Sequence, residues 1–326
     1  MSFAPSQVTT NSGLAHPNII FYERVGLDQL RKKFQFGRPL DRRQLPQKNG
    51  KTIQFYRYNT FGSVTTTGVE GFVSSGQVMQ SRIFTASISQ YDAFVTFSDL
   101  IKMTDMSDQV AQASMELGYQ AGLSVDVITR GVIDAETGAS MSTLGATFTN
   151  RDLANLRAQL AGIDVPPLED GCYTVIMHPF TTFDFLNDPT VGGFMDLTKY
   201  KDGTQAQYQK LDDRGMIGIS NTCKVFESTN VYSSGSPSYR VYGFGLGAVT
   251  YVELEGAGPS NVTDPTKERF KVNVVPAAGP TPYDPAGVYG GAVSYKFYFT
   301  VAIPSGPNGI GGVYRYRYMD ATSTVG

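Results

Sequence analysis

A single long helical pattern interrupts a chain in which most other segments are typical of β-strands. Between residues 107 and 133, apolar side chains recur three, four and seven positions apart, which is the spacing of one helix face. A helix of this length spans about 40 Å at 1.5 Å per residue. We therefore expect an α+β protein in which one long helix forms a structural spine. The apolar stripe consists of Val110, Leu117, Ala121, Val125, Ile128 and Val132.

Turn-forming residues and short β-rich runs make up most of the remaining chain. The 35 glycines and 17 prolines follow no fixed period and argue against a helical bundle. Two shorter helices are predicted, one starting at a capping box in 149–152 and ending at Gly162, the other running from Pro179 to Leu186. Strands are predicted at 51–61, 81–97, 172–177, 215–219, 224–228, 239–244, 248–254, 270–275, 292–303 and 313–319.

A strand, a loop and a second strand follow one another between residues 51 and 97. The loop from Gly62 to Gly76 is small and polar, with Gly68-Val69-Glu70-Gly71 in its middle. This pattern predicts a long β-hairpin whose tip has too few core residues to pack on its own domain. Because a long exposed hairpin is a liability unless a partner covers it, the segment is a first indication of an assembly.

Basic and apolar residues are interleaved in residues 21–48, after a polar, turn-rich tail formed by residues 1–20. The part from Glu23 to Phe34 has the pattern of an amphipathic helix that ends at Gly37 and the Arg38-Pro39 step. Two interpretations remain open: contact with nucleic acid, or an extended arm whose basic groups pair with acids on a neighbouring subunit. The basic residues are Arg24, Arg31, Lys32, Lys33, Arg38, Arg42, Arg43 and Lys48.

The charge balance argues against a dedicated DNA-binding protein. The net charge is −2, from 27 basic and 29 acidic residues, whereas such proteins usually carry a basic excess. A container that encloses DNA without gripping it is compatible with this balance. No segment approaches the roughly 18 apolar residues of a membrane span, and no signal peptide is visible. We therefore expect a protein made in a cytoplasm, with no membrane partner.

Patterns of catalytic or metal-binding residues are not found. His16 lies in the polar tail, His178 is expected to cap or pack, and no G-x-S-x-G elbow accompanies either. Cys172 and Cys223 fit neither a disulfide framework nor a zinc site. The glycine-rich run at 243–247 precedes a β pattern instead of a helix, so it is not a dinucleotide loop. We expect no catalytic residue, no cofactor and no metal.

Several short motifs occur together in an order and spacing that resemble one family. They are Leu45-Pro46-Gln47-Lys48-Asn49-Gly50-Lys51-Thr52-Ile53-Gln54-Phe55 with Arg57-Tyr58, Gly68-Val69-Glu70-Gly71, Ser98-Asp99 with the helix after it, Tyr173 with His178-Pro179, and Asp284-Pro285-Ala286-Gly287 leading to Val293 and Lys296. The chain resembles the major capsid proteins of tailed bacteriophages, typified by the capsid subunit of a large podovirus of enteric bacteria. These proteins adopt the Hong Kong 97 (HK-97) capsid fold.

The resemblance implies a division of the chain into four regions. Residues 1–48 would be an N-terminal arm, 49–97 an extended loop (E-loop), 98–147 with 284–326 a peripheral domain built on the spine helix, and 148–283 an axial domain. Copies would form pentamers and hexamers and tile an icosahedral shell around a double-stranded DNA genome, in a virion assembled in the host bacterial cytoplasm. The expected contacts between subunits come from Arg31, Lys32, Lys33, Arg42, Arg43, Glu70 and Phe72.

One departure from the prototype of the fold is the absence of lysine from residues 52–101. The prototype locks its shell with a covalent bond from a lysine of the extended loop to an asparagine, so we expect a non-covalent shell here. No long scaffolding region precedes the arm, so we expect a separate scaffold protein. A decoration protein and a portal are further candidate partners.

Two alternatives to a capsid protein are kept. The first is an encapsulin-like compartment, which uses the same fold without a genome, and a purified particle containing DNA would decide against it. The second is a β-rich enzyme or carbohydrate-binding module. The chain has no Trp to build the usual aromatic platform of such a module.

Overall fold

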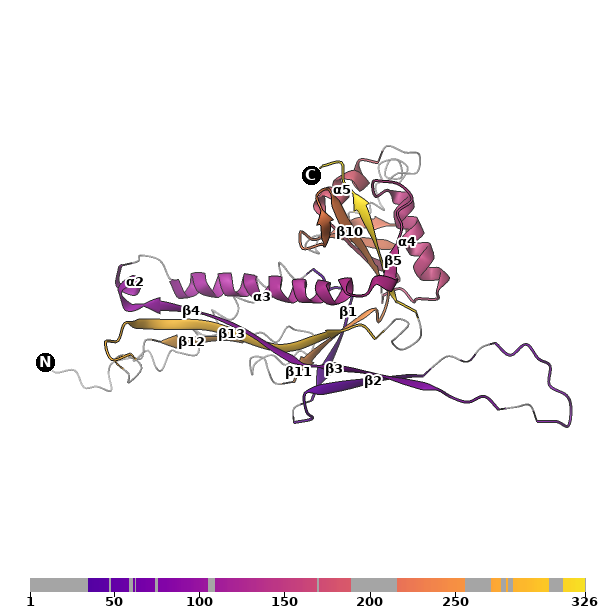
Figure 1. The fold of residues 1–326 in the computed structure, drawn as a ribbon, viewed down its shortest axis with the longest axis horizontal. Helices are drawn as coiled ribbons and strands as arrows, with labels where there is room; N and C mark the ends of the chain where they lie inside the picture. Colours follow the sequence, from indigo (N-terminus) through magenta and orange to yellow (C-terminus); the bar gives the residue numbers. More distant parts are fainter. Residues whose placement is uncertain are drawn as a thin grey trace.

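The protein is described by a computed structural model that covers residues 35–46, 48–58, 61, 63–73, 76–104, 109–168, 170–188, 216–255, 271–276, 280, 284–304 and 313–325. The long helix α3 (Gln109–Asp134) lies along an elongated five-stranded sheet, and a seven-stranded sheet stands at its C-terminal end (Figure 1). A two-stranded hairpin extends away from both. The predictions for residues 1–34, including the tail and the amphipathic helix, lie outside the described residues.

The long strand β13 (Tyr289–Ala302) organises the five-stranded sheet. It pairs antiparallel with β4 (Ser89–Ser98) on one side and with β12 (Lys271–Pro276) and β11 (Val249–Leu254) on the other. Strand β1 (Leu40–Leu45) joins β11 in parallel. Every second residue of β13 is buried in the core that α3 covers, as the two-residue period of a strand requires. These residues are Val293, Tyr295, Phe297 and Phe299.

Helix α3 confirms the predicted spine. Leu117, Ala121 and Val125 of the predicted stripe are buried, and the remaining three residues of the stripe are partly buried beside them. Three residues on the buried face do not fit the apolar pattern, the hydroxyl residues Ser114 and Thr129 and one charged residue. Asp126 has no exposed surface, although nothing in the sequence predicts its burial.

The seven-stranded sheet has the order β5-β14-β10-β6-β8-β7, with β9 paired to β10. Its apolar residues divide between two faces, because neighbouring residues of a strand point to opposite sides. One face packs against helices α4 (Asn150–Gly162) and α5 (Pro179–Leu186). The other face contributes to the core shared with α3. The strands are β5 (Ser140–Met141), β6 (Tyr173–Met177), β7 (Met216–Ser220), β8 (Cys223–Glu227), β9 (Ser233–Gly235), β10 (Ser238–Phe244) and β14 (Tyr316–Thr322).

The capping box predicted for the second helix is confirmed. The Asp152 carboxylate accepts hydrogen bonds from the backbone N–H of Thr149 at 3.0 Å and from its hydroxyl at 2.8 Å. Leu153, Leu156 and Leu160 of this helix have no exposed surface. Two short helices complete the described part of the fold, α2 (Asp99–Thr104) before the spine and a 3₁₀ helix at Thr137–Ala139 (η3) after it.

The hairpin consists of β2 (Thr52–Tyr58) and β3 (Ser81–Ser87), paired antiparallel. The predicted second strand at 81–97 is divided in the structure, because β3 pairs with β2 whereas β4 pairs with β13. The division falls at Ile88, whose side chain is buried and whose N–H donates to the carbonyl of Lys51 at 2.9 Å. The hairpin therefore ends near residue 88, earlier than the predicted boundary at 97.

The two large sheets also divide the chain differently from the predicted ranges. Strands β11 and β12 fall in the range predicted as the axial domain, yet both pair with β13 in the five-stranded sheet. Strand β14 falls in the range predicted as peripheral, yet it pairs with β10 and β5 in the seven-stranded sheet. In chain order, β1 and β4 belong to the five-stranded sheet, β5 to β10 to the seven-stranded sheet, β11 to β13 to the five-stranded sheet again and β14 to the seven-stranded sheet.

Candidate assembly surfaces

The hairpin has two apolar faces, and the described chain covers only one of them. On the inner face the rings of Phe55 and Phe84 lie 6.4 Å apart, and the Arg43 guanidinium lies 5.1 Å from the Phe55 ring. On the outer face Tyr56 and Ile83 stand opposite one another in register, 62% and 59% exposed. A two-stranded hairpin is marginally stable in water by itself. The outer face is therefore an exposed apolar surface on an element that gains little stability from its own two strands.

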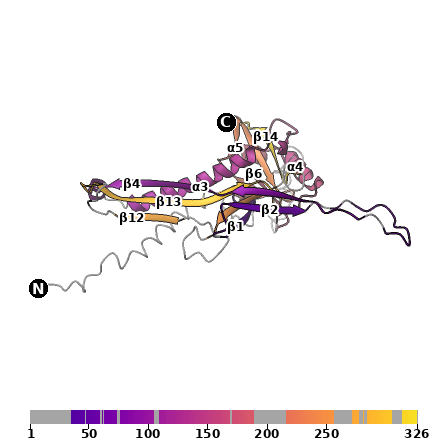
Figure 2. The same ribbon diagram turned by 60° about the horizontal axis from the view of Figure 1, so that its bottom comes forward.

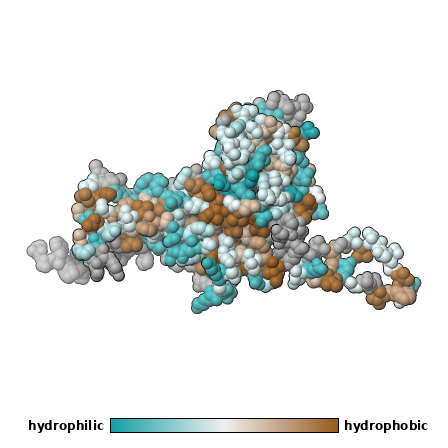
Figure 3. Space-filling view, in the orientation of Figure 1, coloured by the Kyte–Doolittle hydropathy of each residue, from teal (hydrophilic) through white to brown (hydrophobic). Residues whose placement is uncertain are grey.

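The tip of the hairpin carries further exposed apolar side chains. The N–H of Phe72 donates to the carbonyl of Val69 at 3.1 Å, and Gly71 adopts a positive φ of 85° within this turn. The predicted contact residues Glu70 and Phe72 both lie in the turn, and Phe72 is 80% exposed. Figures 2 and 3 show this tip far from the body of the molecule, with hydrophobic residues at its end.

The predicted basic contact residues have different positions. Arg42 and Arg43 are neighbours on β1, and the Arg42 guanidinium lies 6.0 Å from the Tyr251 ring of the same subunit. The Arg43 guanidinium donates to the Asp41 carboxylate at 3.2 and 3.1 Å while half of its side chain stays exposed. Such an exposed ion pair contributes little to stability. A contact from Arg43 to a neighbour stays a prediction, and Arg31, Lys32 and Lys33 lie outside the described residues.

A second exposed apolar surface lies at the opposite end of the molecule, around α2 (Figures 1 and 3). We call it the spine-end patch. The N–H of Asp99 in α2 donates to the carbonyl of Val288 at 2.9 Å, which holds the helix against the start of β13. Contiguous exposed apolar residues of this kind are typical of interaction surfaces. The patch consists of Leu100, Ile101, Met103, Val288 and Tyr289, of which Met103 is 81% exposed.

Sequence reasoning missed the spine-end patch and the outer face of the hairpin. Residues 53–58 show apolar or aromatic side chains at both odd and even positions, which indicates a strand that is apolar on both faces. In the same way, the apolar run Leu100-Ile101 with Met103, between a strand and the spine helix, indicated the spine-end patch.

The residues considered for chemistry are used in packing. Nδ1 of His178 accepts a hydrogen bond from the Phe180 N–H at 3.2 Å, and its ring stacks on Tyr239 at 4.1 Å, which confirms the predicted capping and packing. Burial lowers the pKa of His178. Burial also raises the pKa of the Cys223 thiol to about 12, so this thiol is not activated.

Within the part of the chain that the structure describes, no cluster of His, Cys, Asp or Glu is arranged to hold a metal. Across the same residues, no helix is long and apolar enough to span a membrane.

Residues 83–290 match the family model described as phage capsid protein, and this match covers more than half of the chain. The chain belongs to the phage capsid protein family. It is a major capsid protein, a structural component of the icosahedral shell of a bacteriophage virion. No curated protein matches its sequence.

Solved structures of capsids show the same fold. The capsid of Ralstonia phage GP4 superposes with a TM-score of 0.67 at 12% identity, covering 90% of this chain and 92% of that one. The capsid of cyanophage Pam1 gives a TM-score of 0.60 at 11% identity, covering 86% and 87%. The predicted HK-97-type α+β fold of this capsid protein is thereby confirmed.

A virus-like particle from Pyrococcus furiosus also shares the fold, with a TM-score of 0.52 at 10% identity, covering 92% of this chain and 97% of that one. The fold therefore does not distinguish a phage shell from other protein shells. The family match makes that distinction and disfavours the encapsulin-like alternative.

Proposed function

We propose that copies of this capsid protein form pentamers and hexamers that close into a shell around a double-stranded DNA genome. The observation that carries the proposal is the presence of two uncovered apolar surfaces at opposite ends of one subunit, the hairpin and the spine-end patch (Figure 3). Two different surfaces that recognise each other make a head-to-tail contact, and such contacts generate rings when the rotation closes.

The hairpin of one copy is proposed to lie over a neighbour and to bury its outer face there. Tyr56 and Ile83 supply apolar area on the strands, and Phe72 supplies it at the tip. Burial stabilises a contact by roughly 25 cal/mol per Å² of apolar surface, before the loss of freedom on association is subtracted. Each contact is modest, but one subunit makes several at once, so the shell is held together by avidity and without covalent links.

We propose the following assignment of the regions implied by the resemblance. The proposed peripheral domain is the five-stranded sheet with α3, and the proposed axial domain is the seven-stranded sheet with α4 and α5. Glu70 lies beside Phe72 at the tip, where it is proposed to meet a basic group of a neighbour. Arg31, Lys32 and Lys33, with Arg42 and Arg43, are proposed to pair with acids of an adjacent subunit in preference to DNA.

The capsid protein is proposed to enclose its genome without sequence-specific binding and without enzymatic activity. The net charge of −2 supports enclosure of the genome without tight binding, because a strongly cationic wall would hold the DNA by counterion release. The proposed further partners are a separate scaffold protein, a portal and a decoration protein. Assembly is proposed to take place in the cytoplasm of a host bacterium.

Electron microscopy of the full-length chain, expressed alone and with the scaffold gene expected beside it, tests the proposal. Closed shells, or pentamers and hexamers by light scattering, are the expected result. A compact monomer that persists after co-expression would contradict the proposal. Nuclease-protected DNA inside particles from infected cells would separate a genome shell from an empty compartment.

A further inference from the structure

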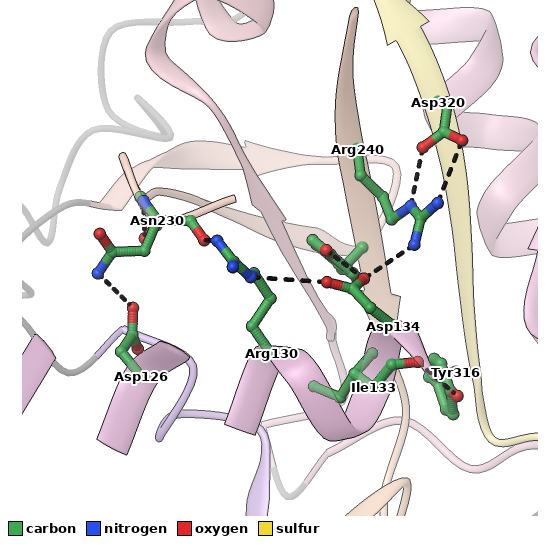
Figure 4. Close-up of polar contacts among 10 residues, drawn as sticks. Asp126, Arg130, Ile133, Asp134, Asn230, Arg240, Tyr316 and Asp320 are labelled. Atoms are coloured by element: carbon green, nitrogen blue, oxygen red, sulfur yellow. Dashed lines mark hydrogen bonds and ion pairs between the residues drawn. The ribbon is translucent and has the colours of Figure 1, made fainter. Parts of the chain in front are cut away.

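The C-terminal end of α3 is bonded to the seven-stranded sheet by several directional contacts (Figure 4). The carboxylate of Asp134, the last residue of α3, accepts from Nη1 of Arg240 at 2.9 Å and from the hydroxyl of Tyr242 at 2.7 Å. The carbonyl of Ile133 accepts from the hydroxyl of Tyr316 at 3.2 Å. Since Arg240 and Tyr242 lie on β10 and Tyr316 on β14, the last turn of the spine is held by two adjacent strands.

Arg240 is the centre of this junction. Its Nε and Nη2 donate to the two carboxylate oxygens of Asp320 at 2.8 and 3.3 Å, while Nη1 donates to Asp134. The guanidinium lies 4.0 Å from the ring of Tyr318 and 4.5 Å from that of Tyr232. Only 11% of the side chain is exposed. Because a guanidinium is planar and its donors form a rigid fork, these contacts fix its direction as well as its position.

The charge of Asp134 is unfavourable for the helix that carries it. The C-terminal end of a helix is the negative end of its dipole, so an acid there destabilises the helix itself. Asp134 is only 13% exposed, and its charge is compensated by Arg240 from the other sheet and by Arg130 at 3.6 Å. Burial lowers the pKa of Arg240, but the hydrogen bonds that it donates to Asp320 and Asp134 outweigh this effect and raise the pKa above its ordinary value. Asp134 therefore stabilises the junction and not the helix that carries it.

A second contact lies two turns earlier on the same face of α3. Buried Asp126 accepts from the Phe36 N–H at 2.8 Å and from the Asn230 side-chain amide at 2.9 Å. Nη1 of Arg130 donates to the carbonyl of Asn230 at 2.7 Å. Asn230 lies between β8 and β9 of the seven-stranded sheet, and residues 126, 130 and 134 are each one turn apart. Contacts at two points along the helix fix its rotation as well as its place.

We propose that Arg240 is a positioning residue for shell assembly, which sets the angle between α3 and the seven-stranded sheet and thereby the curvature of the shell. Apolar burial is non-directional, so the shared core alone tolerates small rotations between the two parts. The hydrogen bonds of the Arg240 guanidinium to Asp134 and Asp320 do not tolerate such rotations. Every copy carries Arg240, so a small change in the angle accumulates around a ring and over the shell. This inference rests on the proposed assembly into a closed shell.

The test compares Arg240→Lys with Val241→Ala in the full-length chain. Lysine keeps the positive charge but lacks the planar fork. Val241 is the next residue on β10, and its fully buried side chain packs on the opposite face of the sheet, away from α3. We expect Arg240→Lys to shift or broaden the distribution of shell diameters seen by electron microscopy. Val241→Ala is expected to lower the melting temperature while its shells keep the wild-type diameter.

A distance measurement on the unassembled chain tests the angle directly. Spin labels at Gln112→Cys on α3 and Ser234→Cys on β9, in a Cys172→Ser background, report the angle through their distance distribution by pulsed electron paramagnetic resonance. Arg240→Lys is expected to broaden or shift the distribution, and Val241→Ala to leave it unchanged. If Arg240→Lys does not fold, Asp320→Asn takes its place. The Asp320 side chain is 41% exposed, and the substitution removes one of the two carboxylates that the fork of Arg240 contacts.

Wild-type diameters and wild-type distances in the folded fork variant would overturn the inference. A change that appears equally in Val241→Ala would also overturn it, because it would follow from lower stability alone. Failure of the wild-type chain to form shells would contradict the proposed function instead, and the label distances would still decide the role of Arg240.

Discussion

The junction at the end of α3 and the hairpin differ in how completely their side chains are paired or buried within one subunit of this capsid protein. At the junction, polar groups of three elements are buried and satisfy one another within one chain, as the contacts of Asp134 and Arg240 show. On the hairpin, apolar residues such as Ile83 remain in water, although the same chain buries their neighbours. The comparison teaches that this subunit completes its internal geometry by itself and leaves its exposed surfaces for a partner to complete.

The largest expected effect concerns assembly and comes from a charge on the outer face of the hairpin. Ile83→Asp is expected to abolish shells in electron microscopy, because a carboxylate cannot be buried there without a partner. The melting temperature of the unassembled chain should change by no more than about 1 °C, since surface substitutions usually stay within about 0.5 kcal/mol. Ile83→Val is the matched control and should assemble normally. Normal shells from Ile83→Asp would show that this face is not an interface.

At the junction the same logic predicts a large loss of folding stability. Asp134→Ala leaves the buried guanidinium of Arg240 with one carboxylate fewer and is expected to lower the free energy of unfolding by about 3 kcal/mol. The control is Asp170→Ala, which breaks the ion pair with Lys224, where the aspartate side chain is 70% exposed and the expected loss is below about 1 kcal/mol. Urea denaturation measures both. Equal losses would mean that the junction is no more important than a surface pair.

The pH dependence of stability should reveal the buried Asp126. Burial raises its pKa from an ordinary 3.8 to about 6, although hydrogen bonds from Asn230 and Phe36 act in the other direction. The folded state thus favours the neutral acid. The contribution of neutral Asp126 to the free energy of unfolding is fully present below pH 4 and is lost as the pH rises through 6, with a magnitude of about 3 kcal/mol.

Urea denaturation of the wild type and Asp126→Asn at pH 4, 5, 6 and 7.5 measures this contribution. The difference between the two proteins should change in favour of the variant as the pH rises, because asparagine does not titrate. The many exposed carboxylates affect both proteins alike and cancel in the difference. A difference that stays constant from pH 4 to pH 7.5 would refute the raised pKa.

The smallest effect compares one substitution in the two regions. A Cβ at Gly243 on β10 would lie 2.2 Å from Cδ2 of buried Leu156, so Gly243→Ala is expected to cost about 1–3 kcal/mol through overpacking. At Gly76 of the hairpin a Cβ would meet nothing within 4 Å, and Gly76→Ala should stay within about 0.5 kcal/mol. Thermal unfolding of both variants checks the difference. A larger loss at Gly76 would show that the hairpin packs on its own subunit.

Local features of this fold could be predicted from the sequence, whereas the pairing of distant segments could not. The stripe of α3 and the capping box at Thr149 and Asp152 depend on residues within one or two turns, and the structure confirms both. The division at Ile88 depends on β13, about 200 residues away along the chain, so the run from 81 to 97 gave no local signal of it.

The candidate sites follow the same rule. An aspartate within a helical pattern is normally exposed, and the burial of Asp126 depends on Phe36 and Asn230, 90 and 104 residues away. Glu70 and Phe72 were expected as contact residues from the family resemblance, and they lie at the exposed tip, where their contact with a neighbour stays a prediction. The outer face of the hairpin was missed because the prediction considered its polar loop and not the two faces of its strands.

The position of the uncovered hairpin at one end and the spine-end patch at the other has a genetic consequence. Both surfaces are encoded by one gene, so a substitution appears in every copy of the shell at the same time. A substitution that weakens the contact of the hairpin with a neighbour leaves the core of its own subunit intact. Only a second substitution, on the surface that binds the hairpin, can compensate for it. Second-site suppressors of assembly defects at Ile83 or Phe72 are therefore expected within this same gene, among codons 100–103 and 288–289.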